Sequence, residues 1–436
     1  MQDTLYPYRP TGLPLEERAL ATGRTLLAIA LMTALVMTLM PFPASYDTFE
    51  IVDGNPVNKY GYSVLAALAL VAHFVFADRR VAMTLLRPAW LILAAWLVLA
   101  SANSIAPDLA FRAALFTIAA MIAATGALSL PADAAAFRLS LTVMALVVLG
   151  LCYFGVVAMP QYAIHQGFEV ESEHSGLWRG IYSHKNVAGQ VMAPLFFVGL
   201  YLWRAGHAKI GVLIAALAFF FAYKTGSKTT LALMPAVMLL VLSGRILGGR
   251  FLPVLFVFGA VTVVALMTLG TVLNDTLDSI LQLVLPGTTF TGRTDLWRFT
   301  LDLMGPQQWI GHGVGTFWST PIVMTAETPF ELNWDPRGIV NAHNGYLDVA
   351  ITIGWPGLVM AIFVLFVLPL VDYVKCRPTR ENNLAADLFL MILTFMLLNA
   401  FLESFFFARG NPSWMLTWIA VVGLRLTARH PMKPAR

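Results

Sequence analysis

Three short stretches of the sequence place cationic side chains beside glycine and hydroxyl residues. They cover residues 178–186, 224–229 and 291–298, and their polar members include Arg179, His184, Lys185, Ser227, Lys228, Arg293 and Arg298. Glycine lets backbone N–H groups approach an anion closely, and a neighbouring cation then neutralises the charge. Each stretch lies where an apolar segment ends, so the sequence predicts a site for a phosphate or diphosphate that belongs to a lipid.

A fourth stretch, residues 340–347, places His343 between the side-chain amides of Asn341 and Asn344. A histidine with an ordinary pKa accepts a proton near neutral pH, which is what a general base must do. The alternative interpretation is structural, with Asn344 capping a helix and His343 as a satisfied residue at the membrane interface. Both interpretations remain open on the sequence alone.

The structural alternative for the cationic stretches is snorkelling, in which long basic side chains anchor helix ends at the membrane surface. Snorkelling readily explains a single basic residue, whereas three clusters of basic residues together favour an anion-binding site. The stretch at 224–229 resembles the end of a phosphate-binding loop but lacks the first glycine and a preceding strand, so nucleotide binding is not predicted. No histidine pair or carboxylate cluster has metal-ligand spacing, and the two cysteines lie in different apolar segments. We therefore predict neither a metal nor a cofactor.

The elements that must position these residues are membrane helices. Of the 436 residues, 58% are hydrophobic and 12% charged, whereas soluble domains carry roughly 25% charged residues. A span needs roughly 20 mostly apolar residues, and twelve candidates lie near residues 25–42, 61–77, 88–105, 112–130, 138–159, 185–203, 208–223, 229–244, 251–273, 345–374, 384–405 and 412–428. We predict an all-α, polytopic integral membrane protein in which residues 1–436 form a single transmembrane domain.

The distribution of charge sets the predicted orientation. Most of the 28 Lys and Arg residues fall in short connections at one set of helix ends, which the positive-inside rule assigns to the cytoplasm together with both termini. The opposite, periplasmic side then has a loop over residues 160–184 and a larger loop over residues 274–344. Apolar residues at helical spacing within 274–285 and 295–304 predict short surface helices in the larger loop.

Ionisable residues are sparse within the predicted spans. Glu403 and Arg409 bracket the outer end of the eleventh span and are candidates to pair with each other, and Asp348 lies one turn into the tenth. A transporter with a charge relay places ionisable groups at mid-membrane, whereas these basic residues gather at one face. The pattern favours a site at a membrane surface over a transport path.

Four short motifs, in order along the chain, resemble the signatures of the O-antigen ligase and polymerase superfamily: His184-Lys185-Asn186, Gly226-Ser227-Lys228, Gly292-Arg293-Thr294 with Trp297, and His343-Asn344-Gly345-Tyr346-Leu347. The large loop that ends in His-Asn-Gly is most similar to that of the O-antigen ligase family. The resemblance implies a GT-C-like glycosyltransferase of the bacterial inner membrane with a periplasmic active site. It also implies transfer of a glycan from undecaprenyl diphosphate to lipid A–core oligosaccharide, with inversion and without a metal.

Within this resemblance, His343 and Arg293 match the family's catalytic residues. On physical grounds, negative charge builds on the departing diphosphate and needs cations, while His343 takes the proton of the acceptor hydroxyl. The residues expected to bind the diphosphate are Lys185, Lys228, Arg298 and Arg179, and the supporting residues are His184, Asn344 and Ser227. The family has a Ser-Arg pair where this chain has Ser227-Lys228, which keeps the charge but loses the bidentate fork of arginine.

Three other functions remain open. An O-antigen polymerase uses the same donor with a second lipid-linked glycan as acceptor, and a protein O-oligosaccharyltransferase uses a Ser or Thr side chain. A lipid-linked oligosaccharide flippase is the non-enzymatic alternative, and it predicts charges along a path through the bilayer.

Overall fold

The computed structural model describes residues 15–43, 56–77, 79–167, 172–290, 292–318, 320–327 and 336–434. Within these ranges the chain is helical, and its β-structure is limited to one isolated bridge between Ile164 and Trp178. The α-helices are α1 (Leu15–Met37), α2 (Pro56–Phe76), α3 (Arg79–Leu85), α4 (Pro88–Ala102), α5 (Pro107–Ser129), α6 (Ala134–Ala158), α7 (Pro160–Ala163), α8 (Lys185–Arg204), α9 (Ala208–Lys224), α10 (Lys228–Gly248), α11 (Phe251–Met267), α12 (Leu269–Leu273), α13 (Asp275–Val284), α14 (Arg293–Met304), α15 (Pro321–Met324), α16 (Gly345–Ile362), α17 (Leu368–Val374), α18 (Arg380–Asn399) and α19 (Pro412–Arg429). A π-helical turn, Phe363–Val367, joins α16 to α17, and short 3₁₀ turns occupy Ser172–His174, Gly305–Trp309 and Pro336–Gly338.

Each predicted span coincides with a helix or a helix pair. By length and composition, seven of the described helices can cross a membrane, or eight if α3 and α4, bent by 47°, form one broken span. The class of multi-pass helical membrane protein is therefore confirmed, whereas the count of twelve spans stays a prediction. Two boundaries differ clearly from expectation, because α1 begins at Leu15 rather than near residue 25 and α18 ends at Asn399 rather than near residue 405.

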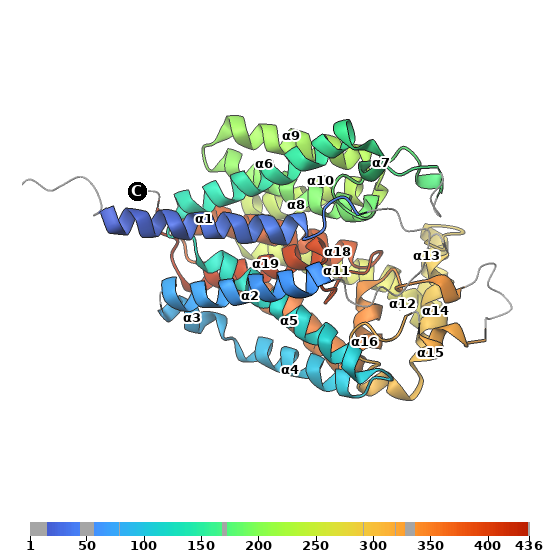
Figure 1. Ribbon diagram of the computed structural model, residues 1–436. Coiled ribbons are helices and arrows are strands. Elements are labelled where there is room, and N and C mark those ends of the chain that lie inside the picture. The colour runs from blue at the N-terminus through green and yellow to red at the C-terminus, as the bar shows by residue number, and fades with distance from the viewer. Residues whose placement is uncertain are drawn as a thin grey trace, which may run out of the picture.

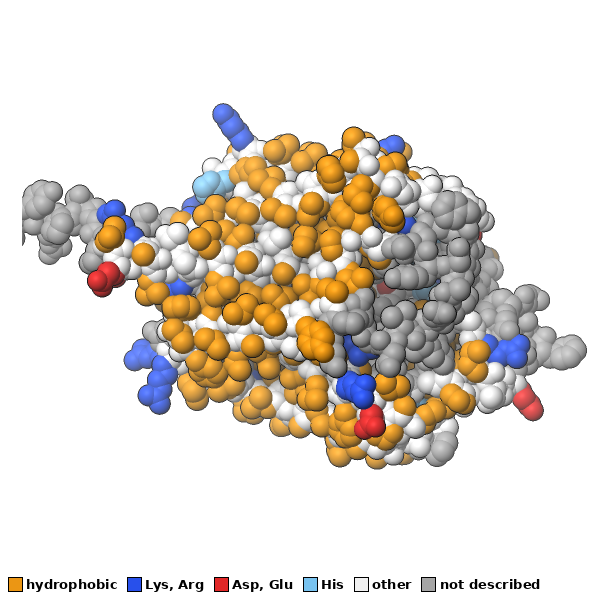
Figure 2. Space-filling view, in the orientation of Figure 1, with side chains coloured by type: hydrophobic (Ala, Val, Ile, Leu, Met, Phe, Trp, Pro, Cys, Tyr) orange, Lys and Arg blue, Asp and Glu red, His pale blue; other side chains and the backbone are white. Residues whose placement is uncertain are grey.

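The long helices run side by side between two chemically different ends (Figure 1). One end, here called the tail end, carries α3 and the C-terminal residues. The other, here called the loop end, carries α7, α13, α14 and α15. Figure 2 shows hydrophobic side chains over the flank between the two ends, with Lys and Arg mainly near its edges. Such a belt is what a helix bundle presents to lipid.

Helices α18 and α19 form the centre of the bundle. Every residue from Leu384 to Asn399 in α18 and from Pro412 to Leu424 in α19 is buried. The indoles of Trp414 and Trp418 lie 6.0 Å apart between ring centres. The short segment that joins these two buried helices lies at the loop end.

Helix α16 is broken where the large loop packs against it. Ile353 and Gly354 leave helical geometry, with a positive φ of 72° at Gly354. The carbonyls freed there accept backbone N–H groups from the loop, with His312 N donating to Ile351 O at 2.8 Å and Gly313 N to Thr352 O at 3.0 Å. The loop is thereby fixed to α16, the helix that begins two residues after His343.

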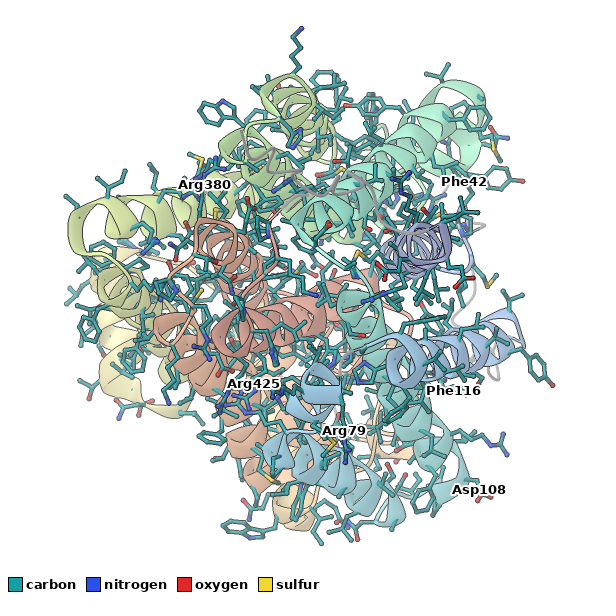
Figure 3. All side chains as sticks on the ribbon, turned by 90° about the vertical axis from the view of Figure 1, so that its left-hand side faces the viewer. Phe42, Arg79, Asp108, Phe116, Arg380 and Arg425 are labelled. Carbon is teal, nitrogen blue, oxygen red and sulfur yellow. The ribbon has the colours of Figure 1, made fainter. Side chains whose placement is uncertain are left out.

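Arginines at the tail end pair with carboxylates on α17 and α18. The ion pairs are Arg87–Asp372 (2.6 Å), Arg425–Asp372 (3.3 Å), Arg138–Glu381 (2.7 Å), Arg204–Asp387 (2.8 Å) and Arg245–Asp387 (3.5 Å). Figure 3 looks onto this end, where Arg79, Arg380 and Arg425 are labelled. Each pair joins helices that are distant in sequence, so the charges bind the bundle together.

Candidate active site

The motif cations share one structural position at the loop end. Lys185 is the first residue of α8, Lys228 of α10 and Arg293 of α14, and His343 precedes the start of α16 by two residues. The N-terminus of a helix carries about half a positive charge and unpaired N–H groups, so it attracts anions. Each motif therefore adds a basic side chain to the positive end of a helix dipole.

Arg293 is set by the turn before α14. Gly292 takes the left-handed conformation (φ 78°) that glycine adopts without strain, and Arg293 then begins the helix. The guanidinium Nη2 lies 3.3 Å from Oε1 of Glu403. One turn along α14, the buried indole of Trp297 donates to the carbonyl of Ala342 at 2.9 Å. Helix α14 thus positions Arg293 and also holds the residue before His343.

His343 has a strained backbone that its neighbours fix. Its φ of 49° is uncommon for a residue other than glycine and costs on the order of 1–3 kcal/mol. Its N–H donates to Oδ1 of Asn341 at 2.9 Å. Before it, Ala342 N donates to the carboxylate of Asp348 (3.1 Å to Oδ2), which also accepts the indole N–H of Trp318 at 2.7 Å. The imidazole is half-buried, with Nδ1 enclosed.

Asn344 joins this loop to the segment between α18 and α19. Its side chain accepts the N–H groups of Tyr346 and Leu347, each at 3.1 Å, so it caps α16 as the structural interpretation expects. Its amide donates to Phe401 O at 3.1 Å, and its own N–H donates to Ser404 Oγ at 2.9 Å. Asn344 is fully buried, which makes each of these bonds expensive to lose.

Glu403 lies at the centre of the cluster. Its Oε1 accepts from Arg293 and, at 2.9 Å, from Nδ2 of Asn186, while its backbone carbonyl accepts Gly345 N at 3.1 Å. Burial raises the pKa of the Glu403 carboxyl above its ordinary value, and the positive charges of Arg293, His184 and Lys185 oppose that rise. The sequence suggested Arg409 as the partner of this carboxylate, and the structure gives it Arg293 instead.

The start of α8 completes this side of the cluster. His184 caps the helix, with Nδ1 accepting Asn186 N at 3.2 Å, and Nε2 of His165 accepts Lys185 N at 3.1 Å. The rings of His165, His174 and His184 gather with centres 5.2–5.8 Å apart. The imidazoles therefore fix the turn from which the side chain of Lys185 emerges.

Ser227 and Lys228 lie beside this turn. Ser227 is buried and bonds through Oγ to Thr230 Oγ1 at 3.0 Å. A Cβ added to Gly189, one turn into α8, would meet the same Thr230 hydroxyl at 2.7 Å. This close approach packs the start of α10 against the start of α8. Lys228 is exposed.

One comparison with known families finds a match. Residues 211–362, about a third of the chain, are similar to the family model described as O-antigen ligase. The matched segment contains Lys228, Arg293 and His343, whereas Lys185 and Glu403 lie outside it. A search of the curated proteins finds no match.

Two of the residues that the sequence assigns to diphosphate binding, Arg298 and Arg179, have partners other than Glu403. Arg298 is half-exposed and approaches Asp278 at 3.9 Å and Asp295 at 3.7 Å, so it links α13 to its own helix. Arg179 is 2% exposed and donates to the carbonyls of Tyr162 (2.9 Å) and Ser183 (3.3 Å). None of these contacts involves Glu403, so we expect both guanidiniums to position their segments rather than to bind the diphosphate.

The sequence singled out Glu403 and Asp348 as ionisable residues near the ends of spans but did not place them among the candidate site residues. Asn186 lies inside a motif and could have been included on that ground. The sequence gave no sign of the partners of Glu403, because Arg293 and Asn186 lie 110 and 217 residues away along the chain. Within the described ranges, no group of three or more His, Cys, Asp or Glu side chains is arranged to hold a metal ion.

Proposed function

We propose that the chain is an O-antigen ligase, which transfers a glycan from undecaprenyl diphosphate to lipid A–core oligosaccharide. The observation that carries the proposal is the shared attachment of Arg293 and the His343 loop to one short segment. Glu403 accepts from Arg293 through its side chain and from Gly345 through its backbone, and Ser404 accepts from Asn344. A cation and a base held by the same rigid segment suit a reaction in which a leaving group departs as a hydroxyl attacks.

The proposal includes an orientation in the membrane. The loop end, with residues 160–184 and 274–344, faces the periplasm, and both termini face the cytoplasm of the bacterial inner membrane. The density of arginines at the tail end supports this choice. We further propose a GT-C-like architecture, because the site lies where loops meet the ends of membrane helices.

In the proposed reaction the bond between the anomeric carbon and the diphosphate oxygen breaks, and negative charge builds on the diphosphate. Arg293, Lys185 and Lys228 stabilise that charge, together with the N-termini of α14, α8 and α10. Preorganised donors of this kind are worth about 10²–10³ in rate each. The cations serve here in the role that a divalent metal has in many glycosyl transfers.

His343 takes the proton of the acceptor hydroxyl as the oxygen attacks from the face opposite the diphosphate. Because Nδ1 of His343 is enclosed, we assign this step to Nε2. A single displacement needs no covalent intermediate and inverts the anomeric configuration. His184, Ser227 and Asn344 support the site by fixing the starts of α8, α10 and α16.

An acceptor-swap assay with detergent-purified protein tests the function. The protein is given the undecaprenyl diphosphate-linked glycan with lipid A–core, with a second lipid-linked glycan, or with a Ser/Thr peptide. We expect product with lipid A–core and little with the others. Product only with the second glycan would make the protein a polymerase, and product only with the peptide an oligosaccharyltransferase. Movement of the donor across proteoliposomes without any product would support a flippase.

A further inference from the structure

A cavity of about 400 Å³ opens at the tail end, the opposite end from the Glu403 cluster. Its walls come from α1, α3, α5, α6, α18 and α19 and from the residues after α19. Those residues are fastened in place, with Met432 N donating to Asn382 Oδ1 at 2.7 Å and Ala134 N to Lys433 O at 2.9 Å. The cavity is therefore built by defined contacts and is independent of the proposed active site.

Two cations that line the cavity, Arg24 and Lys433, differ from the tail-end arginines that pair with carboxylates. Arg87, Arg138 and Arg204 are paired with carboxylates. Within the described ranges, neither Arg24 nor Lys433 forms an ion pair, and the Nε of Arg24 donates only to the carbonyl of Leu130 at 3.0 Å. Two basic groups thus border the cavity with their charge uncompensated.

Among the described residues, one acidic residue, Asp133, lines the cavity, and its carboxylate already accepts a hydrogen bond. Oδ1 of Asp133 caps α6 by accepting Ala136 N at 2.9 Å. Arg24 and Lys433 therefore outnumber the acidic side chain of the described lining. An anion entering here meets an excess of positive charge.

Part of the wall is apolar. Leu128, Phe137, Phe389 and Leu426 contribute to it. A small soluble anion gains nothing from such a wall, whereas an amphiphile places its chains against the apolar surface and its phosphate among the cations. Anionic phospholipids have this chemistry, and basic pockets between membrane helices attract their headgroups.

We propose that this cavity binds the phosphate headgroup of an anionic glycerophospholipid between Arg24 and Lys433. The lipid compensates the charge of both residues and seals the junction of α1 with α19 and the C-terminal residues. It acts as a structural ligand and takes no part in glycan transfer.

Native mass spectrometry of the full-length protein tests the proposal. Protein from nanodiscs of equal phosphatidylglycerol and phosphatidylethanolamine is stripped stepwise, and the retained lipid is identified. We expect wild type to retain phosphatidylglycerol preferentially. Each basic residue near an anionic membrane lipid contributes a preference of roughly fivefold, so Arg24→Ala with Lys433→Ala should lose most of it. Arg79→Ala, exposed on the same end but outside the cavity, is the matched control and should keep the preference.

Two further experiments, one with a cavity-filling variant and one with inorganic phosphate, complete the test. Ala132→Trp fills the cavity while keeping both cations and should also lose the lipid. Inorganic phosphate at millimolar concentration should not displace it. Equal retention of the two lipids by wild type, or unchanged preference in the double variant or in Ala132→Trp, overturns the proposal. Displacement by inorganic phosphate would show a site for soluble anions instead.

Discussion

The two ends of the bundle use charge in opposite ways. At the tail end, Asp372 lies between Arg87 and Arg425 and pairs with both, and the partners come from different parts of the chain. At the loop end, Lys185, Lys228 and Arg293 each begin a helix, and Glu403 pairs with Arg293. Charge that is compensated inside the protein stabilises the fold, whereas charge left in excess at helix N-termini is available to a substrate anion. The comparison predicts that tail-end changes alter stability and loop-end changes alter activity.

The largest expected effect on stability is at Asp372. Asp372→Ala leaves two arginine side chains, each little exposed (13% and 12%), without their shared partner. Removing one member of a buried ion pair costs about 3–5 kcal/mol. Denaturation in detergent should show this loss, with unchanged kcat for the folded fraction. Asp302→Ala, an exposed residue of α14, is the control and should stay within about 0.5 kcal/mol of wild type. Equal free energies of unfolding for the two variants would contradict the claim that the ion pairs of the tail end stabilise the fold.

Arg293→Ala should lower activity rather than stability. Loss of a charged donor to the leaving group costs about 10²–10³ in kcat/KM, and donor binding should weaken as well. Arg298→Ala is the matched control, because it removes an arginine from the same helix whose partners are Asp278 and Asp295. That variant should keep activity within a few-fold of wild type. Arg293→Lys should fall between wild type and Arg293→Ala, because it keeps the charge without the fork. Steady-state kinetics decide, and similar rates for Arg293→Ala and Arg298→Ala would contradict the account.

Asn344 tests how the loop end is held together. Asn344→Ala loses two accepted and one donated hydrogen bond at a fully buried position, which costs about 1–3 kcal/mol. Asn274 makes the same kind of cap on α13 but is exposed, so Asn274→Ala should cost less, about 1 kcal/mol or below. Thermal unfolding compares the two. Activity should fall only in Asn344→Ala, and an equal fall in both would argue against a special role for the His343 loop.

Glu403 gives the smallest and most pH-dependent effect. Because burial raises the pKa of this carboxyl above about 4.5, the folded state loses stability relative to the unfolded state as pH rises through the folded-state pKa. Glu403→Gln lacks this titration, so its melting temperature should gain on that of wild type between acidic and neutral pH. Removing the negative charge also leaves Arg293 less compensated.

Kinetics of the same variant test whether Glu403 positions the site. In Glu403→Gln, KM for the donor should fall a few-fold, because Arg293 is less neutralised, and kcat should fall, because Arg293 is held less firmly. Glu403→Asp should recover part of kcat. A constant melting-temperature difference across pH, with kcat and KM both unchanged, would show that Glu403 neither tunes nor positions Arg293.

The helices were predictable because lipid demands continuous apolar runs, and each predicted span coincides with a helix. The ends of the helices were less predictable. The run of residues 384–405 is mostly apolar, yet α18 ends at Asn399 and residues 400–404 turn to meet the His343 loop. Hydropathy does not distinguish a helix end from such a turn, because both are buried.

The motif residues of the candidate site were predictable from the sequence. Lys185, Lys228 and Arg293 could be found because they break the positive-inside rule, and His343 because it lies between amides. Their arrangement around Glu403, and the structural contacts of Arg179 and Arg298, depend on partners far away in sequence or on backbone carbonyls. A single sequence carries no local sign of such pairs.

Transfer and donor binding measured together in purified His343→Ala test the central claim most directly. A general base contributes about 10²–10⁴ in rate, so glycan transfer to lipid A–core should fall by that factor, while affinity for the undecaprenyl diphosphate-linked donor stays near the wild-type value. Transfer at the wild-type rate would contradict the assignment of the loop end as the catalytic face.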